Sequence, residues 1–366
     1  MSLKIGIVGL PNVGKSTLFN ALTKKQSAQA SNFPFTTIDP NIGIVDLPDQ
    51  RLDQIANLAN SAKTIPATVT FVDIAGLVAG AHKGEGLGNK FLSHIREVDA
   101  IAMVVRDFTD PDVTHVSGEV NPKSDIEVIQ TELVLADLET VEGRLGKLER
   151  EVKSGDKDAL ALQQVLIEAK KTLEEGRGLN SLPYSDNQKN LLKQLQLLSL
   201  KPLFFILNVD ENEIGGAEER IKDLQTTGQL PTSSPVIPVS AKVEAELTEL
   251  SSDEQAEYLA DLGIAEPGLN KVIKTAFDTL GLITYFTAGP KEARAWTIND
   301  GDLAPRAAAA IHTDFERGFI KAEVISFNDY VTNQGELGAK EAGKLRQEGK
   351  GYLVKDGDVI HFKFNV

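Results

Sequence analysis

One segment strongly limits how this chain can fold: residues 9–16 read GLPNVGKS. This segment matches the pattern G-x-x-x-x-G-K-S/T in full, and it lies between a β-branched run at 4–8 and a helix-like stretch at 15–23. Glycines allow the backbone to wrap around phosphate oxygens, and the N–H groups at a helix N-terminus attract an anion. The sequence therefore predicts a strand, a phosphate-binding loop (P-loop) and a helix.

Each side chain of this loop has an expected role toward a nucleoside triphosphate. The ammonium of Lys15 supplies a positive charge for the β- and γ-phosphates, and the Ser16 hydroxyl is a ligand for Mg²⁺. We therefore assign Lys15 a catalytic role and Ser16 a metal-binding role. The residues expected to contact the nucleotide here are Asn12, Val13, Gly14, Lys15, Ser16 and Thr17.

Composition limits the classes of protein to which the chain can belong. Its 366 residues are too many for one compact core, which favours several domains. It has no cysteine, so disulfides, thiolate catalysis and cysteine-ligated zinc are excluded. No run of eighteen apolar residues and no signal-peptide layout occur, so we expect a cytoplasmic protein without a membrane partner. The net charge of -15 makes binding to bare nucleic acid through charge alone weak.

The first half of the chain alternates between strand-like and helix-like segments. After the run at 4–8, continuous apolar strands are expected at 67–73, 99–106, 201–208 and 235–240. Continuously apolar strands separated by helices are typical of a parallel sheet that is covered on both faces. The sequence therefore predicts an α/β domain.

A long connection interrupts this alternation between 109 and 200. Apolar residues recur at steps of three and four along 134–152 and again along 159–173, and the turn-forming triplet Ser-Gly-Asp occupies 154–156. This pattern is typical of an antiparallel helical hairpin with coiled-coil packing. We interpret it as an insertion into the α/β domain, which either stabilises the fold or docks a partner.

The composition changes after about residue 280. Short strands are expected at 282–287, 295–298, 322–325 and 359–362, with a helix at 304–314. These elements predict a small C-terminal α+β domain. Its eleven Lys and Arg nearly balance its twelve Asp and Glu, so it is the better candidate for an RNA contact.

Two segments downstream of the P-loop resemble the switch regions of nucleotide hydrolases. Thr37 lies in the stretch FPFTTIDP, where a threonine can close over the γ-phosphate and complete the Mg²⁺ shell. Asp73 and Gly76 form a D-x-x-G motif at the end of a predicted strand. We expect Asp73 to orient the metal and the Gly76 N–H to contact the γ-phosphate, which gives Gly76 a catalytic role.

The segment that would recognise the base follows the strand at 201–208. GTPases use N-K-x-D here, but this chain has Asn208, Val209 and Glu211. The longer side chain of Glu211 displaces the acceptor for guanine, and Val209 lacks the stem that stacks on the base. Adenine presents a different edge, which backbone groups near Val209, together with Asn208, can recognise. The alternative is that Glu211 still reads guanine from a shifted loop. Ser240 and Ala241 begin a supporting S-A-K loop.

Taken together, these motifs resemble the YchF branch of the Obg-like ATPases. The matching segments are GLPNVGKS, NFPFTTIDPN, DIAGLV, GLGNKFLSHI, the Asn-x-x-Glu pair, and a C-terminal stretch beginning AAAAIHTDFERGF. The resemblance implies a Ras-like G domain at 1–125 and 201–280, an inserted coiled-coil domain at 126–200, and a β-grasp-like TGS domain at 281–366. It also implies ATP as ligand, Mg²⁺ as cofactor, and association with the ribosome or its large subunit, with an RNA contact through the TGS domain.

The expected hydrolysis is slow. The residue after D-x-x-G is Leu77, which cannot orient a water molecule as the glutamine of Ras-like enzymes does. Among the candidate histidines His82, His94 and His115, we favour His115, because its segment HVSGEVNP resembles the family loop whose histidine is proposed to position water. Two alternatives stay open at this point: a translation-associated GTPase, and a non-catalytic module whose binding depends on the nucleotide.

Overall fold

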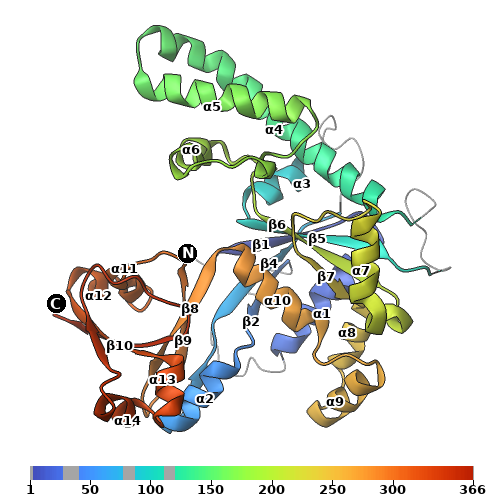
Figure 1. Cartoon of the computed structure of the whole chain (residues 1–366). Helices are drawn as coiled ribbons and strands as arrows, with labels where there is room; N and C mark the ends of the chain where they lie inside the picture. The colour runs from blue at the N-terminus through green and yellow to red at the C-terminus, as the bar shows by residue number, and fades with distance from the viewer. Residues whose placement is uncertain (1–2, 28–40, 77–86, 111–119, 366) are drawn as a thin grey trace. The chain divides into compact units, whose positions relative to one another are not determined.

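The computed structural model describes residues 3–27, 41–76, 87–110 and 120–365 (Figure 1). Contacts within the chain group it into two compact units. The first unit contains Met1–Gly43 and Thr70–Val272, and the second contains Ile44–Val69 and Ile273–Val366. Among the residues described, no helix is both long and apolar enough to cross a bilayer.

The first of two six-stranded sheets has the strand order β2-β4-β1-β5-β6-β7. Their bounds are β1 Lys4–Val8, β2 Ile42–Asp46, β4 Thr68–Asp73, β5 Ala100–Asp107, β6 Leu203–Val209 and β7 Val236–Val239. The pairs β1–β4, β1–β5, β5–β6 and β6–β7 are parallel. Every residue of β5 is buried, which explains its continuous apolar run. The predicted α/β class is confirmed, and the carboxyl ends of β1, β4, β5 and β6 share one edge.

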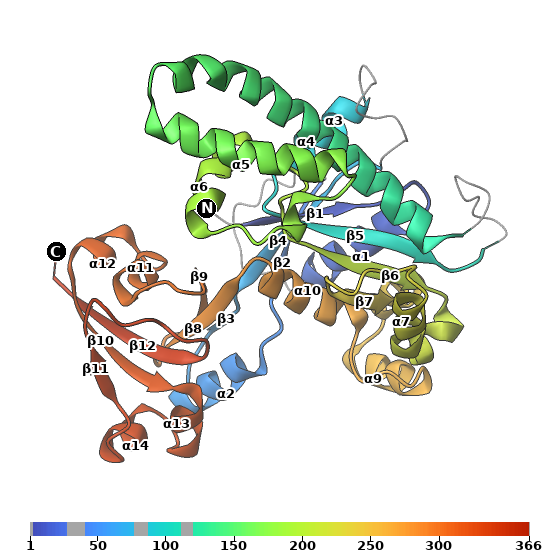
Figure 2. The ribbon, with the colours of Figure 1, turned by 45° about the horizontal axis from the view of Figure 1, so that its top comes forward.

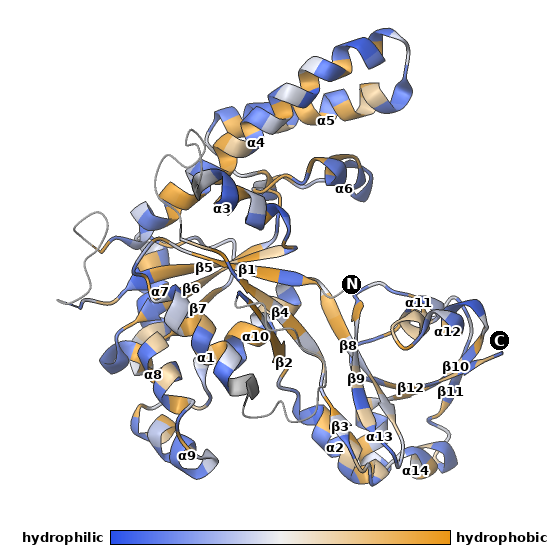
Figure 3. Ribbon diagram, turned by 180° about the vertical axis from the view of Figure 1, so that it is seen from behind, coloured by the Kyte–Doolittle hydropathy of each residue, from blue (hydrophilic) through white to orange (hydrophobic). Residues whose placement is uncertain are grey.

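Helices lie on both faces of this sheet, with α1 on one side and α3 and α4 on the other (Figures 1 and 2). The described α-helices of the first unit outside the hairpin are α1 Lys15–Ser27, α3 Leu87–Arg96, α6 Asp186–Leu192, α7 Ala217–Thr226, α8 Ala241–Leu247 and α9 Ser252–Asp261. Helix α10, Gly268–Thr279, runs from the first unit into the second. Figure 3 shows that the central strands are mostly hydrophobic whereas α9 is largely hydrophilic, as expected for a core between helices that face solvent.

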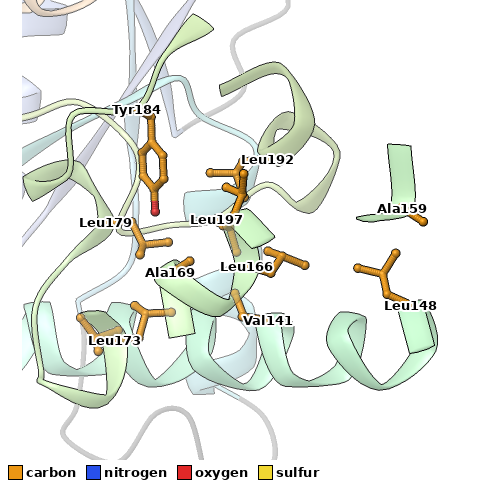
Figure 4. Packing of buried hydrophobic residues seen from close by; sticks show 12 residues of the cluster. Val141, Leu148, Ala159, Leu166, Ala169, Leu173, Leu179, Tyr184, Leu192 and Leu197 are labelled. Atoms are coloured by element: carbon orange, nitrogen blue, oxygen red, sulfur yellow. The ribbon is translucent and has the colours of Figure 1, made fainter. Parts of the chain in front are cut away.

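The insertion is a helical hairpin of α4, Pro122–Lys153, and α5, Lys157–Glu174, as predicted. Gly155 makes the turn with φ of 86°, and the Asp156 side chain caps α5 by accepting from two backbone N–H groups. Figure 4 shows the apolar side chains that meet between the helices. They include Val141, Leu148, Leu166, Ala169 and Leu173, each at most 2% exposed.

The carboxylate of Asp137 connects the helical hairpin to the chain segment that follows it. Asp137 on α4 is fully buried, and its two oxygens accept from the backbone N–H groups of Leu198 and Ser199 and from the Ser199 hydroxyl, each at 2.7 Å. Burial raises the pKa of Asp137, and these three donors oppose that rise. The returning segment adds Leu179 and Leu192 to the hairpin core, so the hairpin and its exit are packed as one body.

The second unit contains a mixed sheet in the order β11-β10-β12-β8-β9-β3. Its elements are α2 Gln50–Ala59, β3 Thr64–Ile65, β8 Leu282–Ala288, β9 Ala293–Asn299, β10 Phe319–Ser326, α13 Phe327–Thr332, α14 Glu336–Glu341, β11 Arg346–Glu348 and β12 Asp358–Phe364. The strands β8–β9 and β10–β12 pair antiparallel, whereas β12–β8 and β3–β9 pair parallel. This arrangement matches the expected small α+β unit, and Tyr285 and Phe362 meet edge to face in its core.

The predicted helix at 304–314 is wrong as a single element. The structure has two short helices, α11 Ala304–Ala309 and α12 Thr313–Arg317. The chain is extended at His312, whose Nδ1 accepts from the backbone N–H of Asp314 at 3.2 Å. The His312 side chain thus caps the second helix, and the extended backbone at this residue separates the two helices, which the alanine-rich composition did not indicate.

A stretch from the first half of the sequence belongs to the second unit. Residues 44–69 contribute α2 and β3, and β3 pairs with β9. Arg51 on α2 forms ion pairs with Asp49 and Asp356, and its guanidinium lies 5.3 Å from the centre of the Phe286 ring. This membership of residues 44–69 in the second unit was not predicted from the sequence. The division of the chain into segments 1–125, 126–200, 201–280 and 281–366 stays a prediction.

Replacing the buried carboxylate of the hairpin should destabilise the protein. Asp137→Ala leaves two backbone N–H groups and one hydroxyl buried without this acceptor, so we expect a loss of about 2–4 kcal/mol in the free energy of unfolding. Urea unfolding followed by circular dichroism measures it. The exposed Glu149 lies on the same helix, and Glu149→Ala is the control, with an expected change within about 0.5 kcal/mol. Equal effects would contradict this role of Asp137.

Candidate active site

The P-loop at 9–16 connects β1 to α1, and two of its residues have left-handed backbones. Asn12 has φ of 64° and Gly14 has φ of 90°. A Cβ on Gly14 would lie 2.2 Å from Nδ2 of Asn208, so a side chain at this position has neither a favourable backbone conformation nor space. Helix α1 begins directly at Lys15. The unpaired N–H groups of its first turn therefore face the concave side of the loop, where they favour an anion.

Lys15 and Asp73 meet at the edge where β1 and β4 end. Their side chains form an ion pair, and they are only 10% and 19% exposed. The two residues are brought together because β1 and β4 are parallel neighbours. A phosphate attracts the lysine and a divalent cation attracts the aspartate, so this pair supplies complementary charges to a metal–phosphate ligand.

The side chains next to Lys15 can supply only some of the oxygen ligands of a metal ion, so the bound phosphate and water would supply the others. Ser16 and Thr17 are exposed at the start of α1. Within the described parts of the chain, no group of three or more His, Asp or Glu residues could hold a metal ion alone. One hydroxyl and one carboxylate at the P-loop therefore fit a cation such as Mg²⁺ that takes its remaining oxygens from phosphate and water.

Gly76 of the D-x-x-G motif lies against the P-loop backbone. A Cβ on Gly76 would lie 3.4 Å from the carbonyl oxygen of Gly9 and 3.6 Å from the backbone nitrogen of Pro11. The backbone of β4 is held beside β1 by a 3.2 Å hydrogen bond from Ile74 N–H to the Ile7 carbonyl. Asp73 and Gly76, which the sequence analysis assigned to one switch, are thus both at the phosphate-binding loop.

Asn208 connects the P-loop to the S-A-K loop. Its side-chain amide donates to the carbonyl of Val13 at 2.9 Å, and its oxygen accepts from the N–H of Ala241 at 2.9 Å. The residue is 5% exposed, and Ser240 beside it is 2% exposed. Val209 is also buried, at 2% exposed, so its side chain packs inside the protein. A buried valine therefore provides no side-chain stem at this position to stack on a base.

Glu211 is held by residues from two other helices. Its carboxylate accepts from Lys242 Nζ at 2.6 Å and lies 3.2 Å from the Tyr258 hydroxyl. The hydrogen bond from Lys242, assisted by Tyr258, lowers the pKa of Glu211, so the carboxylate is ionised at neutral pH.

Some predicted residues fall outside the described parts of the chain. Thr37, Leu77, His82 and His115 are among them, so their roles stay predictions. His94, which the sequence offered as a further candidate, is exposed in the last turn of α3.

A buried arginine that was not predicted from the sequence lies at the P-loop. Arg106 lies at the end of β5, is 2% exposed, and donates to the carbonyl oxygens of Phe108 at 3.1 Å and Asn12 at 3.4 Å. Its guanidinium lies 4.3 Å from the centre of the Phe108 ring. A single charged residue at the end of an apolar strand was the only signal in the sequence. Its position opposite Asn208 in the β5–β6 register shows why it reaches the loop.

Comparisons with known proteins agree with this geometry. Residues 4–142 match a family model described as "50S ribosome-binding GTPase", and residues 282–365 match the YchF GTPase C-terminal model, described as "Protein of unknown function (DUF933)". The chain is 54% identical over 366 residues to the "Ribosome-binding ATPase YchF" of Escherichia coli O157:H7, and 51% identical over 370 residues to that of Bacillus subtilis. Both alignments cover all of both chains.

A solved structure extends this similarity to the fold of the whole chain. The structure of the Schizosaccharomyces pombe YchF GTPase is 36% identical, with a TM-score of 0.88, over 99% of this chain and 98% of that one. Likeness at this level covers the G domain, the helical hairpin and the C-terminal unit together.

A side chain at Gly14 should disrupt the loop. Gly14→Ala introduces a Cβ at a left-handed residue and against Asn208, so we expect it to lower the free energy of unfolding by about 1–3 kcal/mol. We also expect it to weaken binding of a fluorescent adenine nucleotide by about tenfold or more. Urea unfolding and fluorescence titration are the measurements.

The matched control is the same substitution in the helical hairpin. Gly146 lies within α4, and a Cβ there would meet no described atom within 4 Å. Gly146→Ala should therefore leave binding unchanged and stabilise the helix by up to about 1 kcal/mol. Unchanged binding in Gly14→Ala would contradict the assignment of this loop.

Proposed function

The chain belongs to the YchF family, and from this premise we propose that it is a ribosome-associated ATPase that binds ATP with Mg²⁺ and hydrolyses it slowly. The observation that carries the proposal is the meeting of Lys15, Asp73 and Gly76 at the P-loop. These are the residue types that a metal-bound triphosphate requires.

In the proposed phosphate site, each of a few residues has a separate role. Lys15 binds the β- and γ-phosphates, and the N–H of Gly76 contacts the γ-phosphate. Ser16, Thr37 and Asp73 hold Mg²⁺, directly or through water. An ion held by these residues would supply positive charge close to the phosphates. Support comes from the exposed Ser16 and from the Lys15–Asp73 ion pair. In this pair, Lys15 can bind a phosphate in place of Asp73, and Asp73 can bind a cation in place of Lys15.

The proposed base site favours adenine because its acidic side chain is already engaged. Asn208 is bound to both loops, and Glu211 is bound to Lys242. The backbone near Val209, with Asn208, Ser240 and Ala241, is then left to contact the base. The curated relatives are called ATPases and the solved relative a GTPase. The engaged Glu211 favours the first assignment for this chain.

Hydrolysis depends on how the attacking water is oriented. Leu77 lacks a polar group to orient it, so we propose that His115 does so and that the intrinsic rate is on the order of 10⁻⁴ to 10⁻² s⁻¹. We further propose that the nucleotide state controls binding to the ribosome or its large subunit, with an RNA contact through the C-terminal unit. The support is the name that the bacterial relatives carry. With a ribosome as partner, we also propose that the protein acts in the cytoplasm.

Calorimetric titration tests the choice of nucleotide. With Mg²⁺ present we expect ATP to bind at least about tenfold more tightly than GTP, because Glu211 is not free to accept from guanine. Chelating Mg²⁺ should weaken ATP binding. Lys15→Ala is the control and should lose most of the affinity, since it removes the charge at the β- and γ-phosphates.

The same proteins test the ribosome partner. Co-sedimentation with ribosomes should differ between ATP and ADP for the unmodified protein and should be independent of nucleotide for Lys15→Ala.

In the calorimetric titration, tighter binding of GTP than of ATP would contradict the base assignment. Binding of neither nucleotide would contradict the nucleotide site itself.

A separate variant tests the proposed water-positioning residue. His115→Ala should lower the single-turnover rate of ATP hydrolysis by about 10²-fold or more while ATP affinity is retained, because only the reacting water loses its partner. His361→Ala replaces an exposed histidine of the second unit and serves as the control. An unchanged rate in His115→Ala would remove this residue from the mechanism.

A further inference from the structure

The carboxylate of Glu211 has protein partners at both oxygens. Lys242 Nζ lies 2.6 Å from Oε2, and the Tyr258 hydroxyl lies 3.2 Å from Oε1. Neither partner belongs to the Asn208–Glu211 segment: Lys242 lies at the start of α8 and Tyr258 on α9. The acidic residue that would read guanine is therefore already bound by two residues from outside its own segment.

A tyrosine hydroxyl has one proton, and this one has two carboxylates as neighbours. Tyr258 donates mainly to Glu246 Oε2, at 2.5 Å, and its contact with Glu211 is the longer branch of the same hydrogen bond. The two carboxylates raise the pKa of Tyr258, with Glu246 as the larger cause, so the hydroxyl keeps its proton. Lys242 is thus the main partner of Glu211, and Tyr258 is the second.

Packing fixes the positions of these partners. Leu259, next to Tyr258 on α9, is buried against Val243 and Leu247 of α8. Helix α9 also begins with a capping box between Ser251 and Glu254. The two helices that present Lys242 and Tyr258 therefore pack against each other rather than moving independently.

Guanine needs an acceptor for the N1–H and 2-amino donors of its edge, whereas adenine has neither donor at these positions. We propose that Lys242 and Tyr258 are specificity-determining residues, which hold the Glu211 carboxylate on α8 and α9 and so withhold it from guanine. To bind GTP through Glu211, the protein must first weaken these contacts. To bind ATP, it need not. This inference rests on the proposed function, because it explains the choice of purine at the same site.

The experiment measures the ratio of the dissociation constants of GTP and ATP by calorimetry. Lys242→Met removes the ion pair, and Tyr258→Phe removes the hydroxyl. We expect Lys242→Met to lower the ratio by about two- to fivefold, the range for a partly exposed ion pair, Tyr258→Phe to lower it by less, and the double variant to lower it most. The affinity for ATP should stay within about twofold of the unmodified protein. Lys242→Arg keeps a cation at this position and should restore the original ratio.

Two control variants match these changes elsewhere in the first unit. Lys170→Met removes a Lys–Glu pair of similar length, 2.7 Å to Glu142, in the helical hairpin. Tyr184→Phe removes a buried hydroxyl that has no hydrogen-bond partner among the residues described. Neither control should change the ratio. Thermal unfolding of every variant shows whether each protein is folded.

Two results would overturn the inference. The first is an unchanged ratio in Lys242→Met, Tyr258→Phe and the double variant with ATP affinity retained. The second is an equal loss of both nucleotides, which would make the two residues structural. Failure of the proposed function can be distinguished from failure of this inference, because it is measured on the unmodified protein. There it would appear as tighter binding of GTP than of ATP, or as binding of neither nucleotide.

Discussion

The side-chain amide of Asn208 holds together the two halves of the candidate site. One end binds the Val13 carbonyl in the P-loop and the other binds the N–H of Ala241 in the S-A-K loop. Both bonds are buried, so they are not exposed to competition from water and their loss would leave polar groups unpaired. A phosphate loop and a base loop that are far apart in sequence thereby keep a fixed separation. A ligand that spans both loops requires such a separation.

Charge compensation is the second constraint on the site. The positive end of α1 and the ammonium of Lys15 lie beside Asp73, and the anion of Glu211 lies beside Lys242. The first pair is mostly buried, where an unpaired charge is costly, so a ligand that separates its two charges would have to supply an opposite charge to each of them. In the second pair the lysine is exposed and the glutamate is partly exposed, so solvent screens the pair and makes it weaker. Ligand binding and base choice therefore depend on interactions of very different strength.

The parts of the fold that could be predicted from the sequence are those whose cause is local. The P-loop at 9–16 and the helical hairpin follow from the spacing of glycines and apolar residues, and both are confirmed. Residues 44–69 were not assigned to the second unit, because an amphipathic helix reveals that one face is buried but not what covers it. The partners of Glu211 were missed for a similar reason: Lys242 and Tyr258 become its neighbours only through the packing of α8 and α9.

Base selectivity is the difference between the binding free energies of ATP and GTP, so a weak contact can change it if the contact affects only one of the two nucleotides. ATP and GTP carry the same triphosphate, so the interactions of Lys15 and the P-loop cancel in the comparison. What remains is the cost of releasing the Glu211 carboxylate, which falls on guanine alone. An exposed ion pair that adds little to the stability of the fold can therefore appear in full in the ratio of the two dissociation constants. In such a site adenine is favoured because the reader of guanine is occupied, and adenine itself needs no strong new contact.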